Sequence, residues 1–133
     1  MKLLLLALVM APSLAAHTAE PPFTFSVLDV PANELLDLRF ENHSRRTLCL
    51  ADYSWPNEAG IIPASSERIS ISIEGKEYQL HAPIIDPPPL IGAKVKAGQS
   101  ISAYLKYSAF QIPRPLFAKP KVLHMTPRLV ACD

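Results

Sequence analysis

Glycine and cysteine are scarce in this sequence, and long apolar runs are missing. The chain of 133 residues has only four glycines and two cysteines. Its longest apolar run covers about nine residues, whereas a membrane-spanning helix needs about twenty. The glycines form no phosphate-binding loop, and the cysteines have no Cys-x-x-Cys spacing that would predict a zinc site. These absences argue against a membrane anchor, a nucleotide-binding loop and a structural zinc ion.

The spacing patterns of common catalytic sites are also absent. No serine lies in a Gly-x-Ser-x-Gly or Ser-x-x-Lys context, and no spacing forces two carboxylates together. Asn42-His43-Ser44 matches a glycosylation acceptor, but a turn that links two strands explains this tripeptide better. We therefore predict a protein that is not an enzyme and that uses no cofactor.

The start of the chain has the three parts of a secretory signal peptide. A lysine precedes an apolar run over residues 3–11, and a proline and small residues follow. Cleavage after Ala15 fits small-residue preferences better than the alternative cleavage after Ala16. We predict that residues 1–15 are the signal peptide, that 16–133 form one domain, and that the mature protein is periplasmic or secreted.

The two cysteines predict a single disulfide, because an exported protein folds in an oxidising compartment. Cys49 alternates with leucines on both sides, which indicates that it points away from the core that those leucines fill. Cys132 is the penultimate residue. The bridge would therefore pin the C-terminal tail to the strand around Cys49, and closing so long a loop stabilises a domain by about 4 to 5 kcal/mol.

Proline and alternating hydrophobicity together predict an all-β chain. Fourteen prolines interrupt the sequence too often for helices of ordinary length. Period-two alternation is clearest over 100–107, and residues 68–81 read as a β-hairpin turning at Gly75. Two further strands cover 23–27 and 36–41. Weaker candidates are 46–50, 60–63, 92–96, 121–125 and 129–132.

Eight or nine short strands with turns about every ten residues are typical of two antiparallel sheets packed face to face. We predict an immunoglobulin-like antiparallel β-sandwich of about eight strands, similar to immunoglobulin domains in architecture only. A small β-barrel is the alternative. The alternation places Phe40, Ile71 and Leu105 in the core.

Three irregular segments carry residues suited to recognition, because aromatic and arginine side chains on stiff loops are common in binding hot spots. The first holds the only tryptophan, the second is a proline-rich rod, and the third joins an arginine to an aromatic ring. In the alternative interpretation, the aromatic side chains fold back and cap the ends of the sandwich. The predicted partner-binding residues are Trp55, Pro56, Asn57, Asp86, Pro87, Pro88, Pro89, Arg114 and Phe117.

Charge is balanced overall but uneven along the chain. Removing Lys2 leaves twelve basic residues against twelve acidic ones, so nucleic-acid binding has no electrostatic support. Residues 87–132 contain seven basic side chains and no carboxylate. Either the charges of the two halves mix on the surface, or Lys94, Lys96 and Lys106 mark a basic face for an acidic partner.

These features together predict a non-catalytic exported binding module. We expect an inhibitor or immunity-type protein that acts on a protein partner through rigid proline-rich loops. One alternative is a structural or assembly accessory of the cell envelope that adds a strand to its partner. Another is a copper-binding protein: cleavage after Ala16 would make His17 the N-terminus, which would resemble the histidine brace of periplasmic copper carriers and polysaccharide monooxygenases. The sequence leaves the oligomeric state open.

Overall fold

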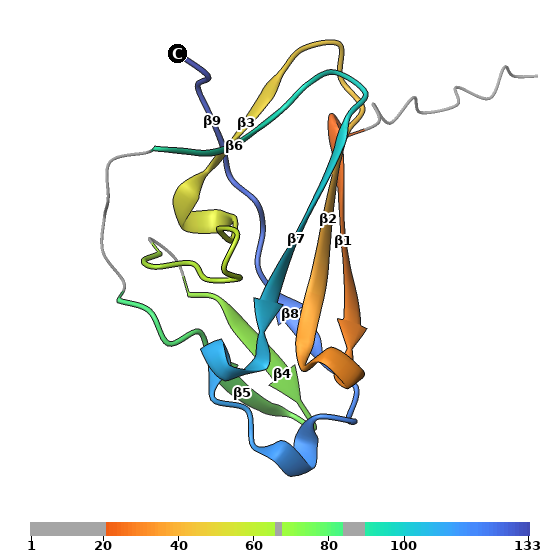
Figure 1. Ribbon diagram of the computed structural model, residues 1–133, viewed down its shortest axis with the longest axis vertical. Helices are drawn as coiled ribbons and strands as arrows, with labels where there is room; N and C mark the ends of the chain where they lie inside the picture. The colour runs from red at the N-terminus through yellow and green to blue at the C-terminus, as the bar shows by residue number, and fades with distance from the viewer. Residues whose placement is uncertain (1–20, 66–67, 84–89) are drawn as a thin grey trace, which may run out of the picture.

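The structure is a computed structural model, and it describes residues 21–65, 68–83 and 90–133 (Figure 1). The predicted signal peptide, His17 and the rod Asp86-Pro87-Pro88-Pro89 lie outside the described residues. The described part contains β1 (Phe23–Val30), β2 (Leu35–Asn42), β3 (Leu48–Ala51), β4 (Ser70–Ile73), β5 (Lys76–Gln79), β6 (Ile91–Val95), β7 (Ser100–Lys106), β8 (Val122–His124) and β9 (Leu129–Val130). Short 3₁₀ turns connect them: η1 (Pro31–Asn33), η2 (Asp52–Ser54), η3 (Tyr107–Phe110) and η4 (Arg114–Leu116).

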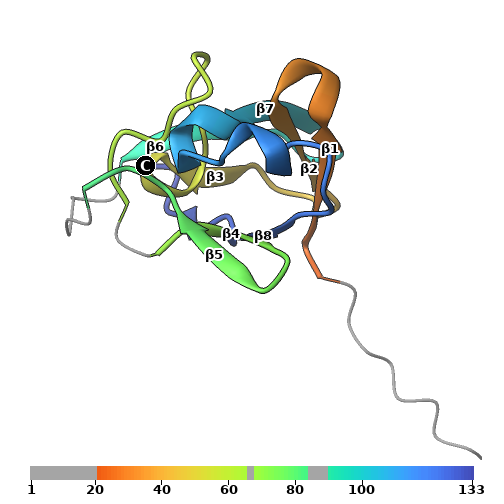
Figure 2. The ribbon, with the colours of Figure 1, turned by 90° about the horizontal axis from the view of Figure 1, so that it is seen from below.

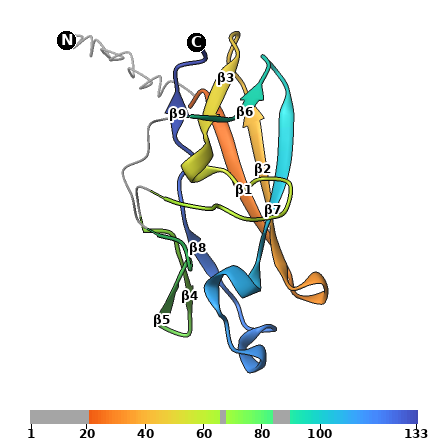
Figure 3. The ribbon, with the colours of Figure 1, turned by 60° about the vertical axis from the view of Figure 1, so that its left-hand side comes forward.

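The strands form three antiparallel sheets of three strands, in the orders β1-β2-β7, β6-β3-β9 and β5-β4-β8. Seen from below, β1, β2 and β7 lie in a layer facing β4, β5 and β8 (Figure 2). The sheet of β3, β6 and β9 lies toward one end of the molecule (Figure 3). No sheet closes into a barrel within the described ranges, so the predicted all-β sandwich is confirmed and the barrel alternative is wrong.

Alternating side chains build the core between these layers. The inward residues of β2 and β4 are almost fully buried, and so are Ile69, just before β4, and Leu105, near the end of β7. Phe40, Ile71 and Leu105, the three predicted core residues, are each 0% exposed. The predicted hairpin is confirmed: Glu74 and Gly75 both have positive φ, which is the geometry of a two-residue turn between β4 and β5.

The predicted strand over residues 60–63 is wrong. Gly60 has a φ of +72°, which turns the chain, and Pro63 has no N–H to donate to a neighbouring strand. The segment is irregular, and its Ile62 side chain is buried in the core from this irregular backbone. Ile62 thus packs in the core without joining a sheet, whereas Ile61 is exposed.

Asn42 holds the corner where the chain passes between two sheets. Its side-chain Nδ2 donates to the carbonyls of Arg46 and Val95 at 2.8 and 2.9 Å, and its Oδ1 accepts from the backbone N–H and hydroxyl of Ser44. At 1% exposure, Asn42 is not accessible to a glycosyl donor. The prediction that this tripeptide is a strand-linking turn is confirmed.

The disulfide joins Cys49 on β3 to Cys132, with their Cα atoms 5.4 Å apart. Next to it, β9 pairs with β3 through Cys49↔Val130 and Leu50↔Leu129. The prediction that the bridge pins the tail to this strand is therefore confirmed. Within the ranges that the structure describes, no helix has the length and apolar character required to cross a membrane.

Candidate functional site

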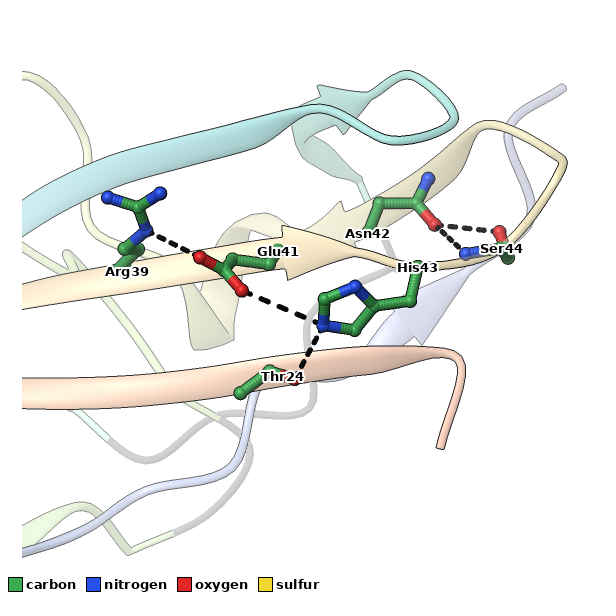
Figure 4. A network of polar contacts seen from close by, with 6 residues as sticks. All are labelled: Thr24, Arg39, Glu41, Asn42, His43 and Ser44. Atoms are coloured by element: carbon green, nitrogen blue, oxygen red, sulfur yellow. Dashed lines mark hydrogen bonds and ion pairs between the residues drawn. The ribbon is translucent and has the colours of Figure 1, made fainter. Parts of the chain in front are cut away.

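A polar network on the outer face of β1 and β2 first resembles a catalytic arrangement (Figure 4). Thr24 Oγ1 lies 2.6 Å from His43 Nε2, a distance suited to proton transfer. However, Glu41 Oε2 approaches the same nitrogen at 3.6 Å, and Arg39 Nε donates to the other Glu41 oxygen at 2.8 Å. A carboxylate that orients a general base contacts the opposite ring nitrogen. This cluster ties two strands together and is not a catalytic relay.

A second, partly buried network anchors the predicted Arg114 loop. The Lys121 side chain is 0% exposed and donates to Asp29 Oδ2 at 2.8 Å and to the carbonyls of Phe117 and Lys119. The hydroxyl of Tyr107 donates to the other oxygen of Asp29. Burial, followed by this hydrogen bond and the nearby carboxylate charges, raises the pKa of Tyr107 above its usual value. With these three acceptors, the Lys121 amino group ties the loop to β1 and to its own backbone.

Arg114 and Phe117 have different surroundings. Phe117 is half-buried, and its ring centroid lies 4.9 Å from that of Tyr107. Arg114 is exposed, with its guanidinium carbon 5.9 Å from the Phe117 centroid. The placement of Phe117 fits the capping alternative, and Arg114 alone projects toward solvent.

Trp55 and Pro56 are buried, and Asn57 is exposed. The Trp55 side chain is 5% exposed, and its ring packs edge-on against Phe25 and Phe40 at 6.4 and 6.1 Å between centroids. This burial fits the capping alternative. The same segment nevertheless lines a hollow of about 510 Å³, with walls from residues 55–58, 92–93 and 101–104. We call this feature the Trp55 hollow.

One wall of the Trp55 hollow is the outer edge of β7, on the side away from β2. Two backbone hydrogen bonds show which residues of β7 are bonded to β2. They run from Asn42 N–H to Gln99 O and from Tyr107 N–H to Glu34 O. Because antiparallel pairs alternate, the odd residues of β7 point their N–H and C=O toward β2 and the even residues point them outward. β7 is the last strand of its sheet. Ser100 and Ser102 therefore present backbone groups that pair with no other described strand, along what we call the β7 edge.

The loop over residues 57–61 covers the far end of this edge and is held rigidly. Asn57 Oδ1 accepts from the N–H groups of Ala59 and Ile61, and the Asn57 N–H donates to the Ile61 carbonyl. Tyr104 Oη donates to the Glu58 carbonyl at 3.0 Å. A Cβ on Gly60 would lie 2.4 Å from the Tyr104 ring, so only glycine permits this contact. The segment passes close to β7 in Figure 3.

Of the predicted site residues, the structure brings together only Trp55, Pro56 and Asn57, at the hollow. Arg114 and Phe117 lie on a separate loop, and the proline rod lies outside the described residues. Sequence reasoning missed Ser102 and Glu58 as site residues. Alternating hydrophobicity predicted the strand that contains residues 100–105, which are uncharged. Its position at the edge of a sheet depends on strand pairing, which the sequence does not reveal.

The charges of the two halves of the chain mix at two places. Lys121 contacts Asp29, and Lys119 Nζ lies 3.4 Å from Glu74 Oε1. These pairs agree with the interpretation in which basic and acidic segments interleave.

The three described histidines lie on separate elements. In the described ranges, no three histidine, cysteine, aspartate or glutamate side chains gather in a metal-binding arrangement. The copper hypothesis depends on His17, so it stays a prediction.

No family model, curated protein or solved structure matches this chain. The class that its own fold and site define is a disulfide-linked, antiparallel all-β sandwich with an open strand edge beside an apolar hollow.

Proposed function

We propose that this chain is a non-catalytic, exported binding module that pairs an extended segment of a protein partner with the β7 edge. Strand addition is the binding mode expected from the sequence for the alternative function, a structural or assembly accessory of the cell envelope. The observation that carries the proposal is the outward-facing backbone of Ser100 and Ser102 beside the Trp55 hollow. Strand addition draws affinity from main-chain hydrogen bonds and specificity from a pocket that receives a side chain.

The composition of the edge supports the same function. Proteins commonly protect edge strands from pairing with a charged side chain, a proline or a bulge. β7 contains no proline, its one charged residue is Lys106 at its last position, and the β2–β7 register runs without a bulge. Among the residues that the structure describes, only the loop over residues 57–61 covers the edge, at its Tyr104 end. The part beside the hollow stays open to a partner strand.

The decisive experiment compares two proline variants of the mature protein. Ser102→Pro removes an outward N–H of β7, and Val27→Pro removes an outward N–H on β1, the opposite edge of the same sheet. Each protein is immobilised and exposed to envelope extract of the source organism. Proteins that bind wild type and Val27→Pro but not Ser102→Pro support the proposal. Equal capture by all three proteins rules it out.

A second candidate keeps the inhibitor or immunity-type function and places it on the Arg114 loop. Arg114 is exposed between two prolines, and Lys121 and Phe117 fix the base of this loop. A stiff loop of this kind loses little entropy when it enters a pocket of another protein. Loss of capture in Arg114→Ala, with capture retained in Ser102→Pro, would favour this candidate.

A further inference from the structure

The walls of the Trp55 hollow differ in chemistry from one end to the other. Trp55, Pro56, Ala93 and Ala103 provide apolar surface. Glu58 is the only acidic or basic residue among the described residues that line the hollow, and it is exposed. Within the described part of the chain, the Glu58 carboxylate has no ion-pair partner. The described walls of the hollow are therefore largely apolar and include one acidic residue, Glu58, which is exposed.

The backbone that carries Glu58 is fixed before any partner arrives. Tyr104 Oη holds the Glu58 carbonyl, and the Asn57 side chain closes the turn that follows. A carboxylate on an ordered backbone attracts a cation without first losing the entropy of its loop. Opposite charge across the rim of an interface selects between partners more strongly than it adds affinity.

We infer that the extended segment bound at the β7 edge carries an apolar side chain for the Trp55 hollow and a lysine or arginine for Glu58. This inference rests on the proposed function, and it adds the chemical class of the segment. The apolar side chain follows from the largely apolar walls of the hollow, and the cation follows from Glu58. An acidic segment is rejected by the same residue, because like charges repel.

Three synthetic peptides test the inference with the mature protein. Each has the sequence X-Thr-Val-Thr-Val-Thr-X with capped ends, where X is lysine, glutamine or glutamate, so strand direction does not matter. Trp55 is the only tryptophan and lines the hollow, so its fluorescence reports binding. We expect the lysine peptide to bind about threefold more tightly than the glutamine peptide, or about 0.7 kcal/mol. The glutamate peptide should bind about threefold more weakly still.

Charge reversal and a matched control complete the test. Glu58→Lys should invert the order of the three peptides, whereas Glu74→Lys makes the same charge change on the β4–β5 turn and should preserve it. Ser102→Pro should weaken all three peptides equally. Equal binding of the three peptides, with loss in Ser102→Pro, overturns the inference and leaves the proposed function intact.

Two other results also overturn the inference. If none of the peptides binds, the hollow does not accept such a segment, and the capture experiment alone decides the proposed function. If sedimentation shows a dimer that Ser102→Pro abolishes, the occupant of the edge is a second copy of this chain.

Discussion

Asn42 illustrates how much of this fold depends on one polar side chain. All its hydrogen-bonding groups are used, and two of its partners are carbonyls at the corner between sheets. Asn42→Ala should lower the free energy of unfolding by about 3 kcal/mol, because it leaves both carbonyls unpaired. Urea denaturation measures this. The neighbouring His43→Ala should change stability by less than about 0.5 kcal/mol, and equal losses would contradict the assigned role.

The raised pKa of Tyr107 leads us to expect that the protein loses stability at alkaline pH. Burial and the bond to Asp29 raise the pKa of Tyr107 in the folded state, whereas its unfolded value is near 10.0. The contribution of the protonated Tyr107 hydroxyl to stability is therefore complete below that unfolded pKa and is lost as the pH rises above it. Wild type should lose stability above about pH 10 more steeply than Tyr107→Phe does. Denaturation curves of both proteins across this pH range test the prediction, and parallel losses would disprove it.

Trp55 marks the limit of prediction from sequence at this scale. Its position in an irregular segment correctly indicated a loop, but its burial depends on Phe25 and Phe40 from distant strands. Whether a loop aromatic faces solvent or core is decided by tertiary packing. Period two located Phe40, Ile71 and Leu105 correctly, because alternation along a strand is itself the cause of their burial.

At the scale of a strand, N–H groups along β7 point alternately toward β2 and outward, and this alternation predicts how two proline substitutions change stability. Ser102 directs its N–H outward, so Ser102→Pro should cost about 1 kcal/mol or less. Ala103 directs its N–H toward β2, so Ala103→Pro breaks a ladder bond and should cost about 3 kcal/mol. Thermal or urea denaturation of the two neighbours measures the difference. If Ser102→Pro is the more damaging, the assigned register is wrong.

The tail strand β9 depends on its disulfide. Only two residue pairs join β9 to β3, and the bridge closes a sequence separation of 83 residues. Reduction should lower the free energy of unfolding by about 4 kcal/mol, as the chain-entropy treatment of long loops gives. Denaturant midpoints with and without dithiothreitol provide the measurement. A midpoint that does not move would show that the tail is held by other contacts.

Strand existence was easier to predict than strand pairing. Alternation identified β1, β2, β4, β5 and β7, and the short strands β3, β6, β8 and β9 begin within two residues of their predicted starts. Which strands become edges depends on contacts between distant segments, and the sequence carries no local signal for it. The candidate site lies at such an edge, which explains why only its Trp55 side was anticipated.

At the scale of the whole molecule, one measurement tests the central claim that the β7 edge is the binding surface. Amide hydrogen exchange is followed by NMR on the mature protein, alone and with the lysine peptide. The Ser102 N–H should exchange quickly in the free protein and slowly in the complex, while the Ala103 N–H stays slow in both because it is bonded to β2. Unchanged exchange at Ser102, with new protection on the Arg114 loop, would contradict this account and move the binding surface to that loop.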